Sequence, residues 1–188
     1  MEALGLDEVW WLVSPGNPLK PRAGMAPLSA RVATARKMAR RAPVRVTAIE
    51  RELGTRFTVD TLRRLVRRYP RRRFVWLMGA DNLVQFSRWK DWRTIARLMP
   101  IAVIARPGYD AAALASPAMA WLRRYRRRSA SLCNRAGWSA PALVYLRFDP
   151  DKRSATAIRQ ADPEWAAALS TGTLRDGITH RRIPADAA

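Results

Sequence analysis

The segment RSATAIR, residues 153–159, combines residue types that bind anions. If a helix begins at Ser154 or one residue earlier, the backbone N–H groups of its first turn point outward at the positive end of the helix dipole. The hydroxyls of Ser154 and Thr156 would add donors, and Arg159 would lie about one turn further along. A serine cap followed by a solvent-facing arginine has the same pattern. The segment therefore indicates either a phosphate site or an ordinary helix start.

A second set of polar and aromatic residues occupies GADNLVQFSRWKDW, residues 79–92. Gly79 suits a tight strand exit, and Asp81 is an acceptor suited to a ribose hydroxyl or a backbone amide. Trp89 and Trp92 offer wide aromatic faces for stacking a ring-bearing ligand. The alternative is that Asp81 caps the next helix and both tryptophans pack in the core.

Two further residues extend the candidate set. Thr58 in TRFTVDTL is either a ligand-binding hydroxyl or the cap of the following helix. Arg106 precedes Pro-Gly at a strand exit, where a guanidinium can clamp a phosphate with two hydrogen bonds. A surface turn arginine would look the same.

The elements that must position these residues alternate along the chain. Apolar runs predict strands at 8–13, 44–50, 74–78, 101–105 and 143–148. Helical patterns cover 28–41, 58–69, 81–99 in two pieces, 112–125 and 154–169. Uninterrupted apolar strands between helices predict a doubly wound α/β fold with a parallel sheet covered on both faces. Ligands of such sheets bind beyond the carboxyl ends of the strands, where the candidate residues fall.

The 188 residues predict one α/β domain over 1–170 and a polar tail over 171–188, which includes His180. One cysteine, Cys133, and one histidine permit neither an internal disulfide nor a common zinc site, so no metal-ligating residue is assigned. No run reaches roughly 18 uncharged apolar residues, and no signal peptide opens the sequence. We therefore expect a cytoplasmic protein without a membrane partner.

The formal net charge of +20 raises the question of nucleic-acid binding. Nearly all the basic residues are arginines, and many lie on expected solvent faces, as in WLRRYRRRSA at 121–130. A solvated surface is favoured over a dedicated nucleic-acid patch, and a small anionic substrate fits the charge as well. No specific nucleic-acid partner is expected, and the partner of the segment 123–128 is left open.

The candidate segments occur together and in a fixed order, and this combination resembles bacterial nicotinate-nucleotide adenylyltransferases. The resemblance runs from Met1 to about Leu169 and rests on SPGNPLKP, FTVDTL, LMGADNLVQFSRWKDW, IARPGY and SATAIR. It implies a Rossmann-like parallel sheet of the nucleotidyltransferase type. It also implies transfer of an adenylyl group from ATP to nicotinate mononucleotide in NAD biosynthesis, with release of pyrophosphate.

The resemblance assigns the acceptor side to five residues. Trp89 would stack on the nicotinate ring, with Thr58 and Gly79 at the pyridine pocket. Arg106 would hold the mononucleotide phosphate, and Asp81 would order the pocket or a ribose.

The resemblance also implies an ATP side. Ser154, Thr156 and Arg159 would hold ATP phosphates, and Lys20 lies where the family places a basic residue beside the reacting phosphates. Lys20 and Arg159 are thus the expected catalytic residues, with Mg²⁺ accompanying ATP.

One departure concerns the start of the sequence. The family begins with a strand and a GGSFNPxHxGH-like loop that holds ATP phosphates, whereas MEALGLDEVWWLV is similar to the segment that comes after that loop in the family. We therefore expect Met1 to be an internal methionine, the first strand to be missing from the written sequence, and the chain as written to be inactive. Arg153 also stands where the family has isoleucine.

Two alternatives remain open. One is a sister adenylyltransferase acting on nicotinamide mononucleotide or pantetheine phosphate, although GADxL…W and RPG favour the nicotinate enzyme. The other is a basic nucleic-acid-binding protein without enzymatic activity. The sequence leaves a homo-oligomer open.

Overall fold

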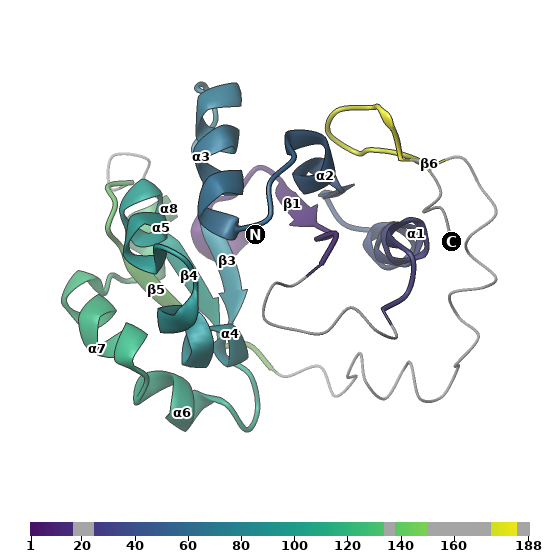
Figure 1. Cartoon of the computed structure of the whole chain (residues 1–188). Coiled ribbons are helices and arrows are strands. Elements are labelled where there is room, and N and C mark those ends of the chain that lie inside the picture. Colours follow the sequence, from purple (N-terminus) through teal and green to yellow (C-terminus); the bar gives the residue numbers. More distant parts are fainter. Residues whose placement is uncertain (17–24, 134–137, 150–173, 184–188) are drawn as a thin grey trace. The chain divides into compact units, whose positions relative to one another are not determined.

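The computed structural model describes residues 1–16, 25–133, 138–149 and 174–183. The chain divides into two compact units, and their elements are labelled in Figure 1. The first unit comprises residues 1–6 and 57–150, and the second comprises 7–56 and 151–188. Among the described residues, no helix is long and apolar enough to cross a membrane.

The first unit is built on a parallel three-stranded sheet in the order β3-β4-β5. The strands are Trp76–Gly79, Ile101–Ile104 and Leu143–Leu146. Their register aligns Gly79 with Ile104 and Ile104 with Leu146, so the three carboxyl ends form one edge. The loops that leave this edge begin at neighbouring positions, as the sequence predicts for a ligand site.

Side chains of alternating strand positions bury one face of this sheet. Ala102 and Val144 belong to a buried hydrophobic cluster that also contains Leu4 and Leu132, and the partly buried Leu77 packs against this cluster. Leu4 comes from the short helix η1 (Glu2–Leu4), and Leu132 from α8 (Ser129–Cys133). The first residues of the chain and a distant helix therefore cover the same face.

The remaining helices of the first unit largely follow the predicted order. They are α3 Thr58–Arg68, α4 Ala80–Gln85, η2 Phe86–Arg88, α5 Trp92–Leu98, α6 Asp110–Leu114, α7 Pro117–Leu122 and η3 Arg123–Tyr125. The prediction of a single helix over 112–125 is wrong, because the helix is interrupted at Ser116. The Ser116 hydroxyl accepts a hydrogen bond from the N–H of Met119, and Pro117 occupies the first position of α7, so a new helix starts there.

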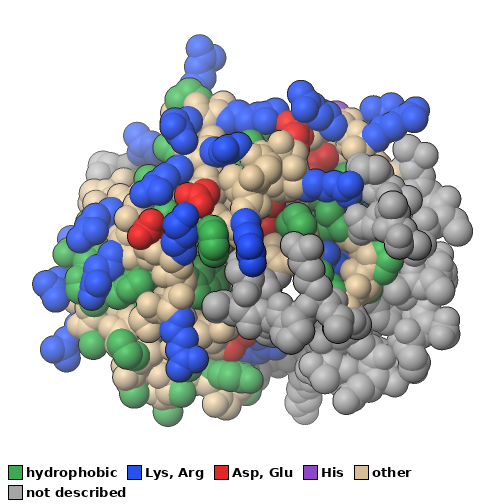
Figure 2. All heavy atoms as spheres, viewed as in Figure 1, with side chains coloured by type: hydrophobic (Ala, Val, Ile, Leu, Met, Phe, Trp, Pro, Cys, Tyr) green, Lys and Arg blue, Asp and Glu red, His purple; other side chains and the backbone are tan. Residues whose placement is uncertain are grey.

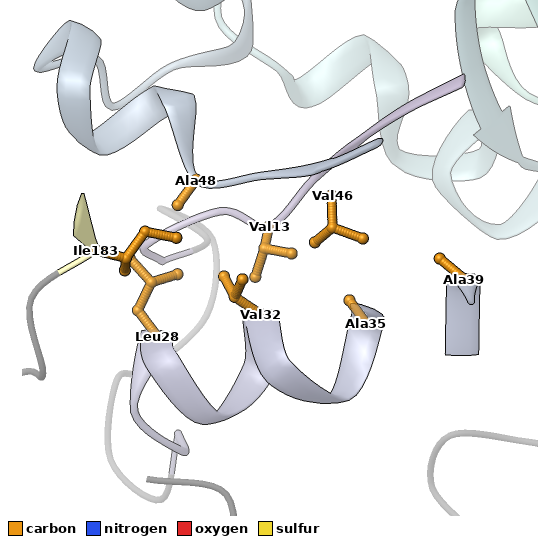
Figure 3. Close-up of a cluster of buried hydrophobic side chains, with 8 residues drawn as sticks. All are labelled: Val13, Leu28, Val32, Ala35, Ala39, Val46, Ala48 and Ile183. Carbon is orange, nitrogen blue, oxygen red and sulfur yellow. The ribbon is translucent and has the colours of Figure 1, made fainter. Parts of the chain in front are cut away.

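The second unit contains the parallel pair β1 (Val9–Leu12) and β2 (Val44–Thr47) with α1 (Leu28–Ala39) packed against it. The buried side chains of α1 recur at helical spacing and point toward Val13 and Val46 (Figure 3). The strand predicted over 44–50 ends early, because residues 49–53 form the short helix α2 (Ile49–Leu53), which stops at Gly54 in the left-handed conformation.

The segment 171–188, predicted as a polar tail, contains secondary structure over residues 174–183. These residues form an antiparallel hairpin of β6 (Leu174–Arg175) and β7 (Arg182–Ile183). Ile183 joins the buried cluster of the second unit, and the buried Asp176 carboxylate accepts hydrogen bonds from Thr47 and the N–H of Ala48. His180 lies exposed in the hairpin turn. The predicted boundary at 170 stays a prediction, and the predicted helix 154–169 lies outside the described residues.

Candidate active site

The carboxyl edge of the first sheet brings two predicted substrate-binding residues together. Asp81 lies in the first turn of α4, directly after β3, and Arg106 follows β4 by two residues. Arg106 Nη1 lies 3.0 Å from Asp81 Oδ2, with the arginine side chain half-exposed. This ion pair connects the exits of adjacent strands and leaves the Arg106 side chain half-exposed.

The second oxygen of Asp81 is an acceptor without a donor. Asp81 Oδ1 is buried and has no hydrogen-bond partner among the described residues. It lies where a side chain at position 79 would go, because a Cβ added to Gly79 would overlap it. The helix α4 starts at a Gly79 cap without a side-chain cap bond, so the capping role considered for Asp81 is not realised. Among the described residues, Arg106 is therefore the partner that the structure shows for the Asp81 carboxylate.

A second carboxylate holds the backbone of Arg106. Asp110 Oδ1 accepts a hydrogen bond from the N–H of Arg106 at 3.1 Å and one from the hydroxyl of Tyr145 at 2.7 Å. Tyr145 belongs to β5, so the loop that carries Arg106 is tied to the neighbouring strand. Asp110 and Tyr145 were not predicted from the sequence. The signals that could have found them are an aspartate four residues after Arg106 and one hydroxyl-bearing side chain in an otherwise apolar strand.

The protonation states of this pair follow from their contacts. Burial, together with the hydrogen bond to Asp110, raises the pKa of Tyr145 to about 12. The hydrogen bonds from Tyr145 and from the N–H of Arg106 lower the pKa of Asp110. At neutral pH Tyr145 is therefore a donor and Asp110 an ionised acceptor. The pair can orient Arg106, but it does not exchange protons near neutrality.

Trp89 lies just after η2 and is half-buried. Its ring makes edge-to-face contacts with Phe86 at 5.4 Å and Trp76 at 6.4 Å between centroids. These contacts fix the ring while part of it stays accessible, as a stacking platform requires. Trp92, by contrast, is buried and packs against Phe86, so the core alternative is correct for Trp92.

Thr58 lies in the first turn of α3. This turn is in contact with Lys90, the residue that follows Trp89. Lys90 Nζ is 3.3 Å from Asp60 Oδ2 and 4.7 Å from the centre of the Phe57 ring. Thr58 is half-buried and is the first helical residue, and the cap position belongs to Phe57 without a side-chain cap bond. Lys90 and Asp60 were not predicted, since a lysine and an aspartate 30 positions apart show no pattern in the sequence.

Four predicted residues lie outside the described part of the chain: Lys20, Ser154, Thr156 and Arg159. They make up the whole predicted ATP side. Within the described residues, no group of three or more histidine, cysteine, aspartate or glutamate side chains is placed to hold a metal ion. The described site therefore consists of the acceptor-side residues and their supports.

Sequence comparison identifies the protein family to which the chain belongs. The sequence model of the cytidylyltransferase-like family matches residues 1–161, and the chain belongs to this family. The family confirms the predicted Rossmann-like α/β fold of the nucleotidyltransferase type.

Individual relatives are similar over most of their length. A protein of Erythrobacter litoralis is 67% identical over 183 residues, which cover 97% of this chain and 84% of the relative. Proteins of Parvibaculum lavamentivorans and Bradyrhizobium sp. ORS 278 are 51% and 47% identical, over 85% and 88% of this chain and 80% and 86% of their own lengths. All three carry the name probable nicotinate-nucleotide adenylyltransferase.

Proposed function

We propose that the chain transfers the adenylyl group of ATP to nicotinate mononucleotide, giving nicotinate adenine dinucleotide and pyrophosphate for NAD biosynthesis. The observation that carries the proposal is the Asp81–Arg106 pair at the carboxyl edge of the sheet, in a unit that also presents Trp89. Arg106 suits a phosphate, Asp81 suits a ribose, and Trp89 suits an aromatic ring. The names of the similar proteins agree with this acceptor.

The chemistry needs no covalent intermediate on the enzyme. An oxygen of the mononucleotide phosphate attacks the α-phosphorus of ATP in line, and a new P–O bond forms. The bond from the α-phosphorus to the oxygen bridging to the β-phosphorus breaks, and pyrophosphate leaves with that electron pair. Catalysis then consists of positioning two anions and neutralising the charge that moves toward the leaving group.

The acceptor-side roles are those that the family resemblance implies, and the Asp81–Arg106 ion pair supports them. Arg106 holds the mononucleotide phosphate with the guanidinium N–H groups that Asp81 leaves free. Asp81 orders the pocket by holding Arg106, or helps to order a ribose. Trp89 stacks on the pyridine ring, and Thr58 and Gly79 border the pyridine pocket.

The ATP-side roles rest on the sequence alone. Ser154, Thr156 and Arg159 hold ATP phosphates, and Lys20 neutralises charge at the reacting phosphates. Mg²⁺ enters with ATP, since this ion binds substrate phosphates readily and keeps several waters. When bound, it would supply charge neutralisation at the triphosphate. We place the reaction in the cytoplasm with its two nucleotide substrates, and a homo-oligomer stays a prediction.

Acceptor selectivity tests the proposal against the sister enzymes. The chain as written, and a longer form that carries the expected upstream strand and loop, are each incubated with ATP and Mg²⁺ plus nicotinate mononucleotide, nicotinamide mononucleotide or pantetheine phosphate, and the adenylylated products are separated by chromatography. We expect turnover with the nicotinate compound to exceed the other two by at least tenfold. Preference for either competitor would overturn the assignment of substrate, and no product from any acceptor with the longer form would overturn the proposed activity.

A further inference from the structure

Three arginines surround one tryptophan on the surface of the first unit. The guanidinium carbons of Arg93, Arg97 and Arg124 lie 6.0, 5.7 and 5.9 Å from the centre of the Trp121 ring. Arg93 also lies 4.7 Å from the Trp92 ring, and Arg124 lies 5.9 Å from the Tyr125 ring. We call these three arginines with the Trp121 ring the Trp121 cluster.

The cluster is assembled by two segments distant in the sequence. Arg93 and Arg97 are one turn apart on α5, while Trp121 is on α7 and Arg124 on η3. The buried Trp92 ring anchors Trp121 at 5.4 Å between centroids. The arginine side chains are exposed, and the ring they share restricts their motion.

A guanidinium that lies over a ring keeps most of its hydrogen-bonding capacity. Contact with the ring uses the flat face of the group, whereas the N–H donors point outward in its plane. One such donor is taken, because Arg124 Nε donates to the Trp121 carbonyl at 3.2 Å. The others are available for an anion, and no ion pair joins these three guanidiniums to a carboxylate in the described part of the chain.

Three positive charges are thus concentrated in a small area. No two of the guanidinium carbons can be more than about 12 Å apart, which is twice the longest distance to the shared ring. Arg123, Arg126, Arg127 and Arg128 follow on the same chain segment and are also exposed. Figure 2 shows Lys and Arg side chains spread over the described part of the visible face. Such a concentration is unfavourable unless an anion relieves it.

We propose that the Trp121 cluster binds a polynucleotide through its phosphates, without regard to base sequence. Each strand of a DNA duplex carries one phosphate per roughly 3.4 Å of helix axis, and an extended single strand spaces its phosphates more widely, so about three phosphates span the cluster. A membrane surface fits less well, because Trp92 is buried and Trp121 and Tyr125 are half-buried beneath arginines, so no ring is free to enter the lipid. This binding site is separate from the proposed reaction and does not depend on it.

Any protein of this charge binds nucleic acid to some extent, so the test compares two variants of equal charge. The first replaces the cluster arginines (R93Q, R97Q and R124Q). The control replaces three exposed arginines that no ring covers in the described part of the chain (R40Q, R67Q and R71Q). Binding of a labelled oligothymidylate of about 20 nucleotides, long enough to span the cluster at roughly 3.4 Å per phosphate, is followed by fluorescence anisotropy across a series of KCl concentrations. Circular dichroism first shows that each variant is folded.

We expect the cluster variant to lose at least tenfold in affinity at low salt, and the control less than threefold. The slope of log K against log salt should fall by about 2 in the cluster variant, at about 0.7 for each lost phosphate contact. W121L should weaken binding by several-fold without changing charge, because the arginines lose their shared support. Equal losses in the two triple variants would overturn the proposal. Displacement of the oligonucleotide by polyglutamate at equal charge concentration would also overturn it, since it would assign the surface to acidic proteins.

Discussion

Arg106 is held at both ends, by Asp110 at its backbone and by Asp81 at its guanidinium. An arginine on a turn otherwise loses conformational entropy each time it binds a ligand, which offsets part of the binding energy. Here Tyr145 fixes Asp110 through a 2.7 Å hydrogen bond, so the support extends to a strand of the sheet. At the scale of the residue, the arginine proposed to bind the phosphate is oriented by contacts within the protein.

Tyr145→Phe should raise the KM for nicotinate mononucleotide about fivefold, because one hydrogen bond to a charged group is lost, at about 1 kcal/mol or more. The KM for ATP should not change. In the background of Arg106→Lys the same substitution should have little further effect, since Tyr145 acts through Arg106. Steady-state kinetics of the two single variants and the double variant measure this coupling, and Tyr69→Phe is the matched control. Additive effects would show that Tyr145 does not act through the arginine.

Trp89→Ala should weaken binding of nicotinate mononucleotide far more than binding of ATP. Stacking contributes about 0.5–1.5 kcal/mol beyond buried area, so the loss should be at least several-fold. Separate titrations of each substrate by calorimetry measure it. Trp11→Ala, which removes an exposed tryptophan of the second unit, serves as control. Equal losses for both substrates would rule out the stacking role.

Two glycines at the ends of secondary-structure elements should respond to alanine in opposite ways. Gly79 has an ordinary backbone conformation, and its missing side chain makes room for Asp81 Oδ1. Gly54 has a φ of +60° and nothing within 4 Å of an added Cβ. The first glycine is therefore required for space, and the second for conformation.

Gly79→Ala should displace Asp81, weaken the pair with Arg106 and reduce affinity for nicotinate mononucleotide about fivefold, with little change in stability. Gly54→Ala should instead lower the free energy of unfolding by about 1 kcal/mol and leave substrate affinity unchanged. Calorimetric titration and chemical denaturation of both variants separate the two effects. A reversed pattern would contradict the reason given for each glycine.

The hairpin of β6 and β7 depends on one buried carboxylate. Burial alone would raise the pKa of Asp176, but hydrogen bonds from the N–H groups of Thr179, Ile178 and Ala48 and from the Thr47 hydroxyl outweigh burial and lower it. A lowered pKa in the folded state means that the ionised form stabilises the fold above the unfolded-state pKa of about 3.9. This contribution is lost as pH falls through the lower pKa of the folded state.

Asp176→Asn should destabilise the second unit by about 1–3 kcal/mol at pH 7, because an amide NH₂ replaces one accepting oxygen and opposes the donors around it. The difference from the parent chain should shrink as pH falls below about 4, near the unfolded-state pKa. Hydrogen exchange of the Ala48 and Ile178 amides, measured at several pH values, reports the change in local stability around Asp176. Asp149→Asn, at an exposed aspartate, is the control. A difference that persists unchanged at low pH would exclude the ionised carboxylate as its source.

The physical character of each element decided how much could be predicted from the sequence. Strands such as Ile101–Ile104 are continuous apolar runs, so their existence and parallel arrangement were predictable. Arg106 and Asp81 were found because each closely follows such a strand. The hairpin 174–183 was missed because its contribution comes from a polar group, Asp176, whose partners lie 128 and 129 positions away. The Tyr145–Asp110 bond is likewise a tertiary contact without a local pattern.

At the scale of the whole molecule, the described acceptor-side residues all belong to the first unit. Thr58, Gly79, Asp81, Trp89 and Arg106 lie between residues 57 and 150. The chain belongs to the cytidylyltransferase-like family, and the net charge of +20 favours the approach of anionic nucleotides. The central claim is that the carboxyl edge of β3-β4-β5 binds nicotinate mononucleotide for adenylyl transfer.

The most direct test is to soak a crystal of the chain with the proposed product, nicotinate adenine dinucleotide, and to determine its structure. We predict that the pyridine ring lies on Trp89 and that the phosphate of the nicotinate half lies within hydrogen-bonding distance of the Arg106 guanidinium. Density for the dinucleotide at another surface, with Arg106 still bound only to Asp81, would contradict this claim.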